Sequence, residues 1–168
     1  MKYSLLLILL TFFSGYNSNA QFFKKDAGFA HTFSIVARDE VTGEMAVGVQ
    51  SHWFSVGTAV SWGEAGVGVV ATQSFVNKSY GLKGLALMKQ GKTAPDALKE
   101  LLAVDEGREV RQVAMIDAHG NVNAYTGKNC IDYASNIVGK NYSVQSNMML
   151  TNNVCEAMSK AFLGSEGK

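Results

Sequence analysis

The chain has few cysteines, a single proline and almost no excess of basic over acidic residues. Only 2 of its 168 residues are cysteine, too few for a disulfide scaffold or a four-cysteine zinc site. A single proline beside 17 glycines indicates tight turns and closely packed strands, not linkers. The balance of 15 Lys+Arg against 14 Asp+Glu gives no electrostatic case for nucleic acid. With 47% hydrophobic and 17% charged residues, the chain is not disordered.

No apolar run is long enough to cross a bilayer, which requires about 20 residues. The longest, Leu5–Phe13, follows the positive Lys2 and precedes small residues at Ser18 and Ala20. This pattern predicts a signal peptide over residues 1–20, cleaved before Gln21, and a secreted or periplasmic protein without membrane association. A retained N-terminal anchor is the alternative interpretation.

The remaining residues divide into a leader, 21–31, and one domain, 32–168. Alternation predicts strands and a 3.6-residue period predicts helices. Blocks of strands and blocks of helices, not alternation between them, favour an α+β fold with layers. The expected strands are 32–38, 45–50, 59–62, 67–72, 110–116, 122–126, 131–138 and 142–147. The expected helices are 79–90, one that Thr93 caps, and one that Thr151 caps.

Several features carry no clear chemistry. The three histidines, His31, His52 and His119, lie too far apart in sequence for a zinc triad, so neither a metal nor another cofactor is expected. The glycines of residues 63–68 precede no helix, which a phosphate loop requires. An exported protein could form a disulfide between its two cysteines, at positions 130 and 155, but two buried thiols fit equally well.

Thr32 is the strongest candidate for catalysis, because it begins the first predicted strand directly after the irregular leader. If the chain began at Thr32, its own α-amine, with a pKa of about 7.7–8.0, could activate the hydroxyl. An ordinary strand threonine is the alternative. Trp53, Phe54 and Trp62 could line a binding cleft, although core aromatics at a sheet end fit as well.

A long, ordered set of segments carries a family resemblance. HTFSIVARDEVTGEMAVGVQ (31–50) continues through SHWFSVG, WGEAGVGVVATQSFVNKSYG, GREVRQVAMIDAHG and YSVQSNMM. Together they resemble domain-of-unknown-function family 1028, which is placed in the Ntn (N-terminal nucleophile) hydrolase superfamily. The resemblance runs from about His31 to Phe162. It implies an αββα sandwich of two antiparallel sheets with outer helices.

The resemblance also implies roles for particular residues. Thr32 occupies the nucleophile position at the head of the first strand. Gln73 and Ser74 stand at the junction where backbone groups of Ntn hydrolases usually stabilise the oxyanion. Gln50 and Ser51, at the end of the second strand, would supply supporting polar groups. With Trp53 and Trp62, they form the predicted substrate-binding set.

The chain departs from that pattern in three ways. An N-terminal nucleophile requires a cut between His31 and Thr32 after the signal peptide is removed. The lysine that proteasome-like members carry on the third strand is missing from residues 59–62. The family domain extends further than residues 151–163, so the sandwich is expected to be incomplete at its C-terminus.

The leading hypothesis is an exported Ntn-type amidohydrolase that cleaves a small amide or peptide through Thr32. A non-catalytic binding module of the cell envelope on the same fold is the alternative, since fold does not fix function. A structural or assembly protein, active as a homo-oligomer, is a third interpretation.

Overall fold

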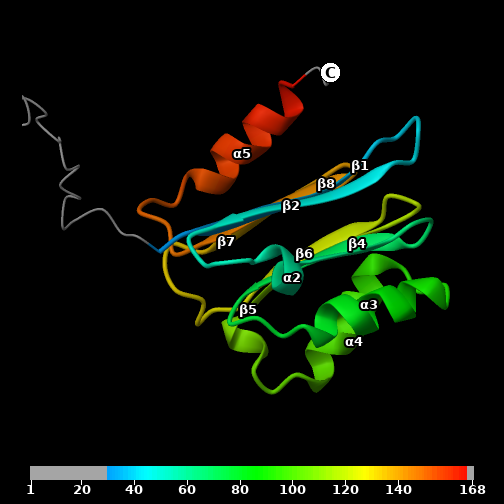
Figure 1. Cartoon of the computed structure of the whole chain (residues 1–168), viewed down its shortest axis with the longest axis horizontal. Coiled ribbons are helices and arrows are strands. Elements are labelled where there is room, and N and C mark those ends of the chain that lie inside the picture. Colours follow the sequence, from blue (N-terminus) through cyan, green and yellow to red (C-terminus); the bar gives the residue numbers. More distant parts are fainter. Residues whose placement is uncertain (1–29, 166–168) are drawn as a thin grey trace, which may run out of the picture.

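The computed structural model describes residues 30–165 and shows two four-stranded antiparallel sheets packed face to face (Figure 1). The expected signal peptide and most of the leader therefore lie outside the described residues. The first sheet has the strand order β2-β1-β8-β7. Its strands are β1 (Thr32–Arg38), β2 (Met45–Ser51), β7 (Ser135–Gly139) and β8 (Tyr142–Asn147).

The second sheet has the strand order β3-β4-β5-β6, so each strand pairs with its neighbour in sequence. Its central strands, β4 and β5, are almost entirely buried because helices cover one face and the first sheet covers the other. The strands are β3 (Ser61–Glu64), β4 (Gly68–Ser74), β5 (Arg111–Asp117) and β6 (Val122–Thr126).

Helices cover the outer faces of both sheets. The pair α3 (Ser79–Lys89) and α4 (Ala94–Val104) packs on the second sheet, and α5 (Val154–Leu163) packs on the first (Figure 1). The predicted cap of α4 is confirmed, because the Thr93 hydroxyl accepts a hydrogen bond from the Asp96 N–H. The expected α+β architecture of two antiparallel sheets with outer helices is thus confirmed.

The alternation of β1 determines which of its side chains face the second sheet. Thr32, Ser34 and Val36 are buried, and Val36 packs between the sheets against residues of β4 and β5. Ile35 and Ala37 point the other way and pack in the cluster beneath α5. Thr32 therefore lies on the face of β1 that meets the second sheet.

Three local expectations were wrong. The segment expected as a strand at 59–62 begins instead with a short helix, α2 (Gly57–Val60), which delays β3 until Ser61. The strand expected over 131–138 begins only at Ser135. Asn153 precedes the first residue of α5, and Thr151 bonds the Asn153 side chain instead of capping the helix.

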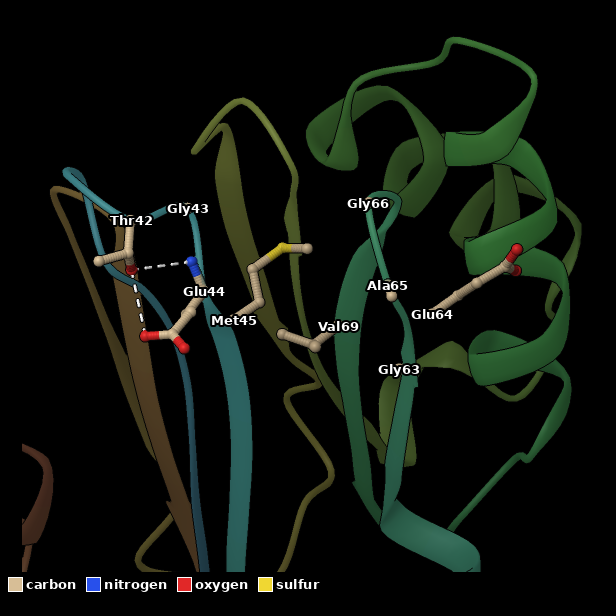
Figure 2. Close-up of a pocket in the computed structure, with 9 residues that line it drawn as sticks. All are labelled: Thr42, Gly43, Glu44, Met45, Gly63, Glu64, Ala65, Gly66 and Val69. Atoms are coloured by element: carbon tan, nitrogen blue, oxygen red, sulfur yellow. Dashed lines mark hydrogen bonds between the residues drawn. The ribbon is translucent and has the colours of Figure 1, made fainter.

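The two ends of the sandwich differ. At one end, an open cleft of about 480 Å³ lies between the turn joining β1 to β2 and the turn joining β3 to β4 (Figure 2). Both of its carboxylates already have partners, since Glu44 accepts from the neighbouring Thr42 hydroxyl and Glu64 pairs with Lys89 on α3. The predicted site residues belong to the other end, where β1 begins and β2 and β4 finish.

Candidate functional site

A pocket of about 260 Å³ adjoins Thr32 and contains most of the predicted site residues. Thr32 comes from the start of β1, Ser51 from the end of β2, and Gln73 and Ser74 from the end of β4. Trp53 comes from the loop after β2. The remaining lining residues are Phe54, Ser55, Val56, Ala59, Val60, Val76 and Met148.

The Thr32 hydroxyl is held in place by its strand neighbour. Thr32 pairs with Ser51 across the β1–β2 ladder, and their hydroxyl oxygens are 2.7 Å apart, so one donates to the other. Ser51 also accepts from the Trp53 N–H at 3.2 Å, which ties the pocket's aromatic loop to the same oxygen. With only 4% of Thr32 exposed, this hydroxyl is a buried polar group at the edge of a pocket.

A buried amide network lies beside Thr32, between the sheets. The Nε2 group of Gln112 on β5 shares its two hydrogens among three acceptors: the Thr126 hydroxyl and the carbonyls of Ser135 and Ser146. This fixes the orientation of the Gln112 amide, because its NH₂ group has to face those oxygens.

The fixed Gln112 amide orients two further side chains. Its oxygen accepts from Gln73 Nε2 at 2.7 Å and from Asn147 Nδ2 at 2.9 Å. Gln73 and Asn147 therefore present their oxygens elsewhere, and neither oxygen has a hydrogen-bond partner among the described residues. Asn147 pairs with Thr32 in the β1–β8 ladder, and Gln73 lines the same pocket as Thr32.

The Ser74 backbone N–H is available on the pocket side of β4. The Phe75 N–H donates to the Val110 carbonyl, so the alternation of the antiparallel ladder turns the Ser74 N–H away from β5. On that side β3 begins only at Ser61, which pairs with Ala71, and α2 replaces the strand before it. A backbone donor without a ladder partner therefore borders the pocket.

The pocket wall also concentrates unusual backbone conformations. Of the four non-glycine residues with positive φ in residues 30–165, three line this pocket: Ser55 (55°), Ser74 (67°) and Met148 (59°). Such conformations cost roughly 1–3 kcal/mol each and concentrate at functional sites, where the surrounding structure maintains them. Their coincidence here is independent support for this pocket as the site.

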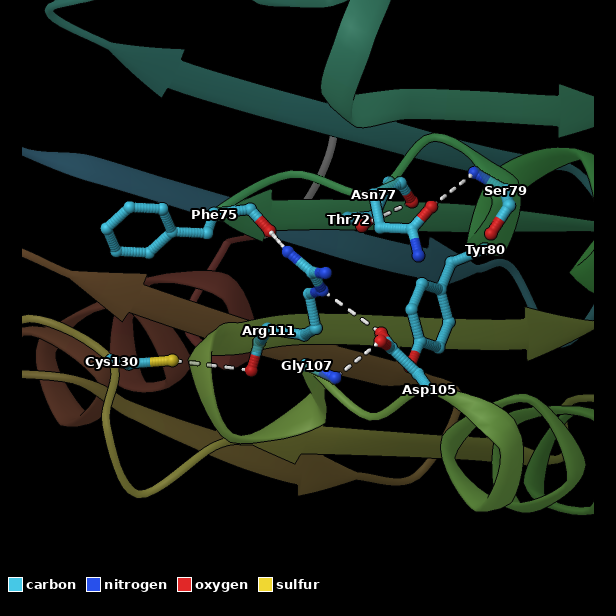
Figure 3. A network of polar contacts seen from close by, with 9 residues as sticks. All are labelled: Thr72, Phe75, Asn77, Ser79, Tyr80, Asp105, Gly107, Arg111 and Cys130. Atoms are coloured by element: carbon cyan, nitrogen blue, oxygen red, sulfur yellow. Dashed lines mark hydrogen bonds and ion pairs between the residues drawn. The ribbon is translucent and has the colours of Figure 1, made fainter.

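A polar network beneath the β4 terminus holds the Ser74 turn (Figure 3). The Arg111 guanidinium donates through Nη1 to the Phe75 carbonyl at 2.8 Å and through Nε to the Asp105 carboxylate at 3.0 Å. Tyr80 and the Gly107 N–H also donate to that carboxylate. Asp105 thereby fixes Arg111, and Arg111 fixes the backbone that follows Ser74.

This network shifts two pKa values. Burial disfavours the charged form of Asp105, but hydrogen bonds from Arg111, Tyr80 and the Gly107 N–H outweigh it and hold its pKa below the ordinary 3.8. Burial, together with the hydrogen bond to Asp105, raises the pKa of Tyr80. Asp105 is therefore a carboxylate at neutral pH, and Tyr80 is neutral.

The lowered pKa of Asp105 predicts how its contribution to stability depends on pH. A depressed folded-state pKa stabilises the fold above the ordinary value, and this contribution is lost as the pH falls through the folded-state value. Asp105→Asn should therefore lower the free energy of unfolding by about 1–2 kcal/mol at pH 7, and the deficit should shrink below about pH 4. Urea denaturation at both pH values checks this. The exposed Glu40→Gln is the control, and a deficit that stays constant with pH would rule the argument out.

The peptide bond before Thr32 has two contacts with His52. The His52 N–H donates to the His31 carbonyl at 3.2 Å, and the His31 N–H donates to His52 Nδ1 at 3.1 Å. These contacts hold the His31–Thr32 junction against the loop that follows β2. The sequence singled out His52 only as one of three scattered histidines, because its contact with residue 31 depends on the β1–β2 pairing.

Two predicted site residues lie away from the pocket. Gln50 alternates with Ser51 on β2, so its side chain is on the outer, exposed face of the first sheet. Trp62 packs against Gly81 of α3, on the helix-covered face of the second sheet, and its indole N–H donates to the Ala59 carbonyl. Trp62 therefore fits the alternative interpretation, a core aromatic, and not a residue of the binding cleft.

Some members of the site were not predicted. Gln112 and Asn147 are amide residues at inward positions of otherwise buried strands, a signal that the alternation contained. Met148, Val56 and Val76 follow or precede strands, and only the fold brings them together.

The two cysteines, which are the other candidate reactive residues, do not line this pocket. Cys130 and Cys155 are both buried free thiols. Burial raises the pKa of the Cys130 thiol, despite opposing hydrogen bonds with Ser74 and the Gly127 backbone.

Within residues 30–165, no three His, Cys, Asp or Glu side chains lie close enough to hold a metal ion. No helix in that range is long and apolar enough to cross a membrane.

Comparison with known proteins identifies the family. The profile described as "Family of unknown function (DUF1028)" matches residues 32–168. The crystal structure of protein SPO2555 from Silicibacter pomeroyi, described with the same family, is similar with a TM-score of 0.78 and 30% identity. The match covers 82% of this chain and 64% of that chain, so this chain spans less than two thirds of its length. No curated protein matches. The chain therefore belongs to DUF1028, a family of unknown function.

Proposed function

We propose that this protein is an exported amidohydrolase of the Ntn type, which cleaves a small amide or peptide with Thr32 as nucleophile. The observation that carries the proposal is the buried Thr32 hydroxyl, which adjoins a pocket and is hydrogen-bonded to Ser51. The pocket also contains Ser74, whose backbone N–H is turned away from the β5 ladder.

The first step in this proposal is cleavage of the chain before Thr32. The Thr32 hydroxyl attacks the His31 carbonyl carbon, the peptide C–N bond breaks, and the acyl group moves to the Thr32 oxygen as an ester. Water then hydrolyses the ester, which releases a carboxylate on His31 and a free α-amine on Thr32. The hydrogen bond from the His52 N–H to the His31 carbonyl supports this step, because it would stabilise the developing oxyanion.

The second step is turnover. The free α-amine of Thr32, with an ordinary pKa of about 7.7–8.0, takes the proton of the hydroxyl as it attacks the substrate carbonyl. The Ser74 N–H is the proposed donor to the oxyanion. Collapse of the tetrahedral species transfers the proton to the leaving amine and leaves an acyl ester on Thr32, which water hydrolyses. No lysine is needed near the hydroxyl, which accords with the sequence of β3, SWGE.

Hydrolysis of a chromogenic N-acyl anilide by the purified protein tests the proposal. The rate should depend on the Thr32 hydroxyl and should rise through the titration of the α-amine, near pH 8. An anilide that is hydrolysed equally well without that hydroxyl would rule it out.

A binding module on the same fold is the second candidate, and the exposed aromatics at the pocket favour it. Trp53 and Phe54 are 66% and 98% exposed, which is costly unless a ligand covers them. A ligand that binds this pocket without being hydrolysed would support this alternative over the hydrolase.

A further inference from the structure

The pocket beside Thr32 has no charged residue in its wall. Its lining combines the aromatic side chains of Trp53 and Phe54 with aliphatic ones from α2 and the loop after β4. Its polar members are Thr32, three serines and Gln73. Apart from the Thr32 α-amine, which acts in its neutral form in the proposed reaction, this wall offers an ionised group no partner for the hydration it would lose, and this disfavours charged ligands.

The charges close to the pocket are neutralised. Arg111 reaches the Phe75 carbonyl beside the pocket, but its guanidinium is paired with Asp105, and both side chains are largely buried. The environment therefore favours an uncharged ligand.

Gln73 supplies the pocket's specific polar feature. Its side chain is 1% exposed, and its Nε2 group is committed to Gln112. Its oxygen has no donor within the described part of the chain. An unpaired buried acceptor is costly, so a ligand whose N–H reaches this oxygen through a small side-chain shift would be favoured over one that cannot donate.

The size of the pocket limits the ligand. Pockets for drug-sized ligands typically measure about 300–1,000 Å³, and this one is slightly smaller, about 260 Å³. Trp53, Phe54 and Val76 are partly or fully exposed at its rim and would lose contact with water when an apolar group enters.

We propose that this pocket selects small, uncharged amides whose acyl group is apolar, such as a hexanoyl or phenylacetyl group, and whose N–H donates to the Gln73 side-chain oxygen. As a statement about substrate class, this inference rests on the proposed hydrolase function. As a statement about binding, it can be tested without turnover.

Isothermal titration calorimetry of the full chain at pH 8 provides the binding test. The probes are hexanamide, adipamate and N,N-dimethylhexanamide. Adipamate is a chain of the same length that ends in a carboxylate, and N,N-dimethylhexanamide lacks the N–H. Hexanamide should bind at least about tenfold more tightly than either analogue.

A charge introduced into the wall should change that preference. Val76 is 39% exposed, so Val76→Lys should fold, and its ammonium group should improve adipamate binding relative to hexanamide at least about tenfold. Val138→Lys is the matched control. Val138 is a similarly exposed valine on β7, does not line the pocket, and its replacement should leave the ratio unchanged.

The outcomes separate this inference from the proposed function. Preferential binding of hexanamide that Val76→Lys alters supports the inference, and if no amide is then hydrolysed, only the hydrolase proposal fails. Hydrolysis of adipoyl and hexanoyl anilides at equal rates would leave the hydrolase standing and overturn the inference. Equal affinity for all three probes, or no binding of any, would also overturn it.

Discussion

Thr32→Val should abolish amide hydrolysis, with a rate at least about 10³-fold below that of the unmodified protein. Valine keeps the shape and strand preference of threonine but lacks the hydroxyl that bonds Ser51. The free energy of unfolding should fall by only about 0.5–1.5 kcal/mol, the net value of one hydrogen bond. Loss of activity would therefore come from loss of the nucleophile, not from loss of the fold.

Thr32→Ser is the matched variant, because it restores the hydroxyl and removes only a methyl group. Its rate should lie within about tenfold of the unmodified rate, measured on the same anilide at pH 8. If the valine variant retained more than a tenth of the original rate, another group would have to be the nucleophile. If serine and valine variants were equally inactive, packing of the methyl group would matter more than the hydroxyl.

The second large effect concerns stability and the centre of the amide network. Gln112→Leu removes five polar contacts at once, at a residue with no exposed surface: three from its NH₂ group, which shares two hydrogens among three oxygens, and two to its oxygen. The abandoned carbonyls and amides have few alternative partners between the sheets. We expect the free energy of unfolding to fall by about 3 kcal/mol or more, because each unsatisfied buried group costs about 1–3 kcal/mol.

Urea denaturation measures this loss, with Gln50→Leu as the control. Gln50 has an exposed side chain on β2, so the same chemical change should alter the free energy of unfolding by less than about 0.5 kcal/mol. A loss below about 1 kcal/mol for Gln112→Leu would mean that the network relaxes or takes up water. In that case the Gln112 amide would not be fixed, and the orientation assigned to the Gln73 amide would lose its basis.

Much of this fold was predictable from alternation and caps, because the buried faces of strands and helices repeat with fixed periods. β1, β2, β5, β6 and β8 lie close to their expected positions. The strand predicted to begin before Ser61 was wrong because Gly57–Val60 is short and apolar. Periodicity cannot distinguish a four-residue helix from a strand. The predicted helix cap at Thr151 was wrong because a threonine near a helix start can bond more than one side chain or backbone group, and here it bonds Asn153.

The site was predictable only in part, and for a physical reason. Thr32, Ser51, Gln73 and Ser74 stand at strand ends, where the resemblance placed them, and the structure brings them to one pocket. Gln50 lies at the expected strand end, but neighbouring residues of a strand point to opposite faces of the sheet. Its side chain therefore faces away from the pocket that Ser51 lines. The contacts of His52 and Asn147 depend on pairing between distant strands, which one sequence does not specify.

The N-terminus of the purified protein tests the central claim most directly. The full chain, expressed with the proposed signal peptide over residues 1–20 and recovered after export, is analysed by intact mass and N-terminal sequencing, with Thr32→Val alongside. We predict a mature chain that begins at Thr32, whereas the valine variant keeps residues 21–31. A stable chain that begins at Gln21 and nevertheless hydrolyses amides would contradict the account, because the α-amine of Thr32 would never be free to act.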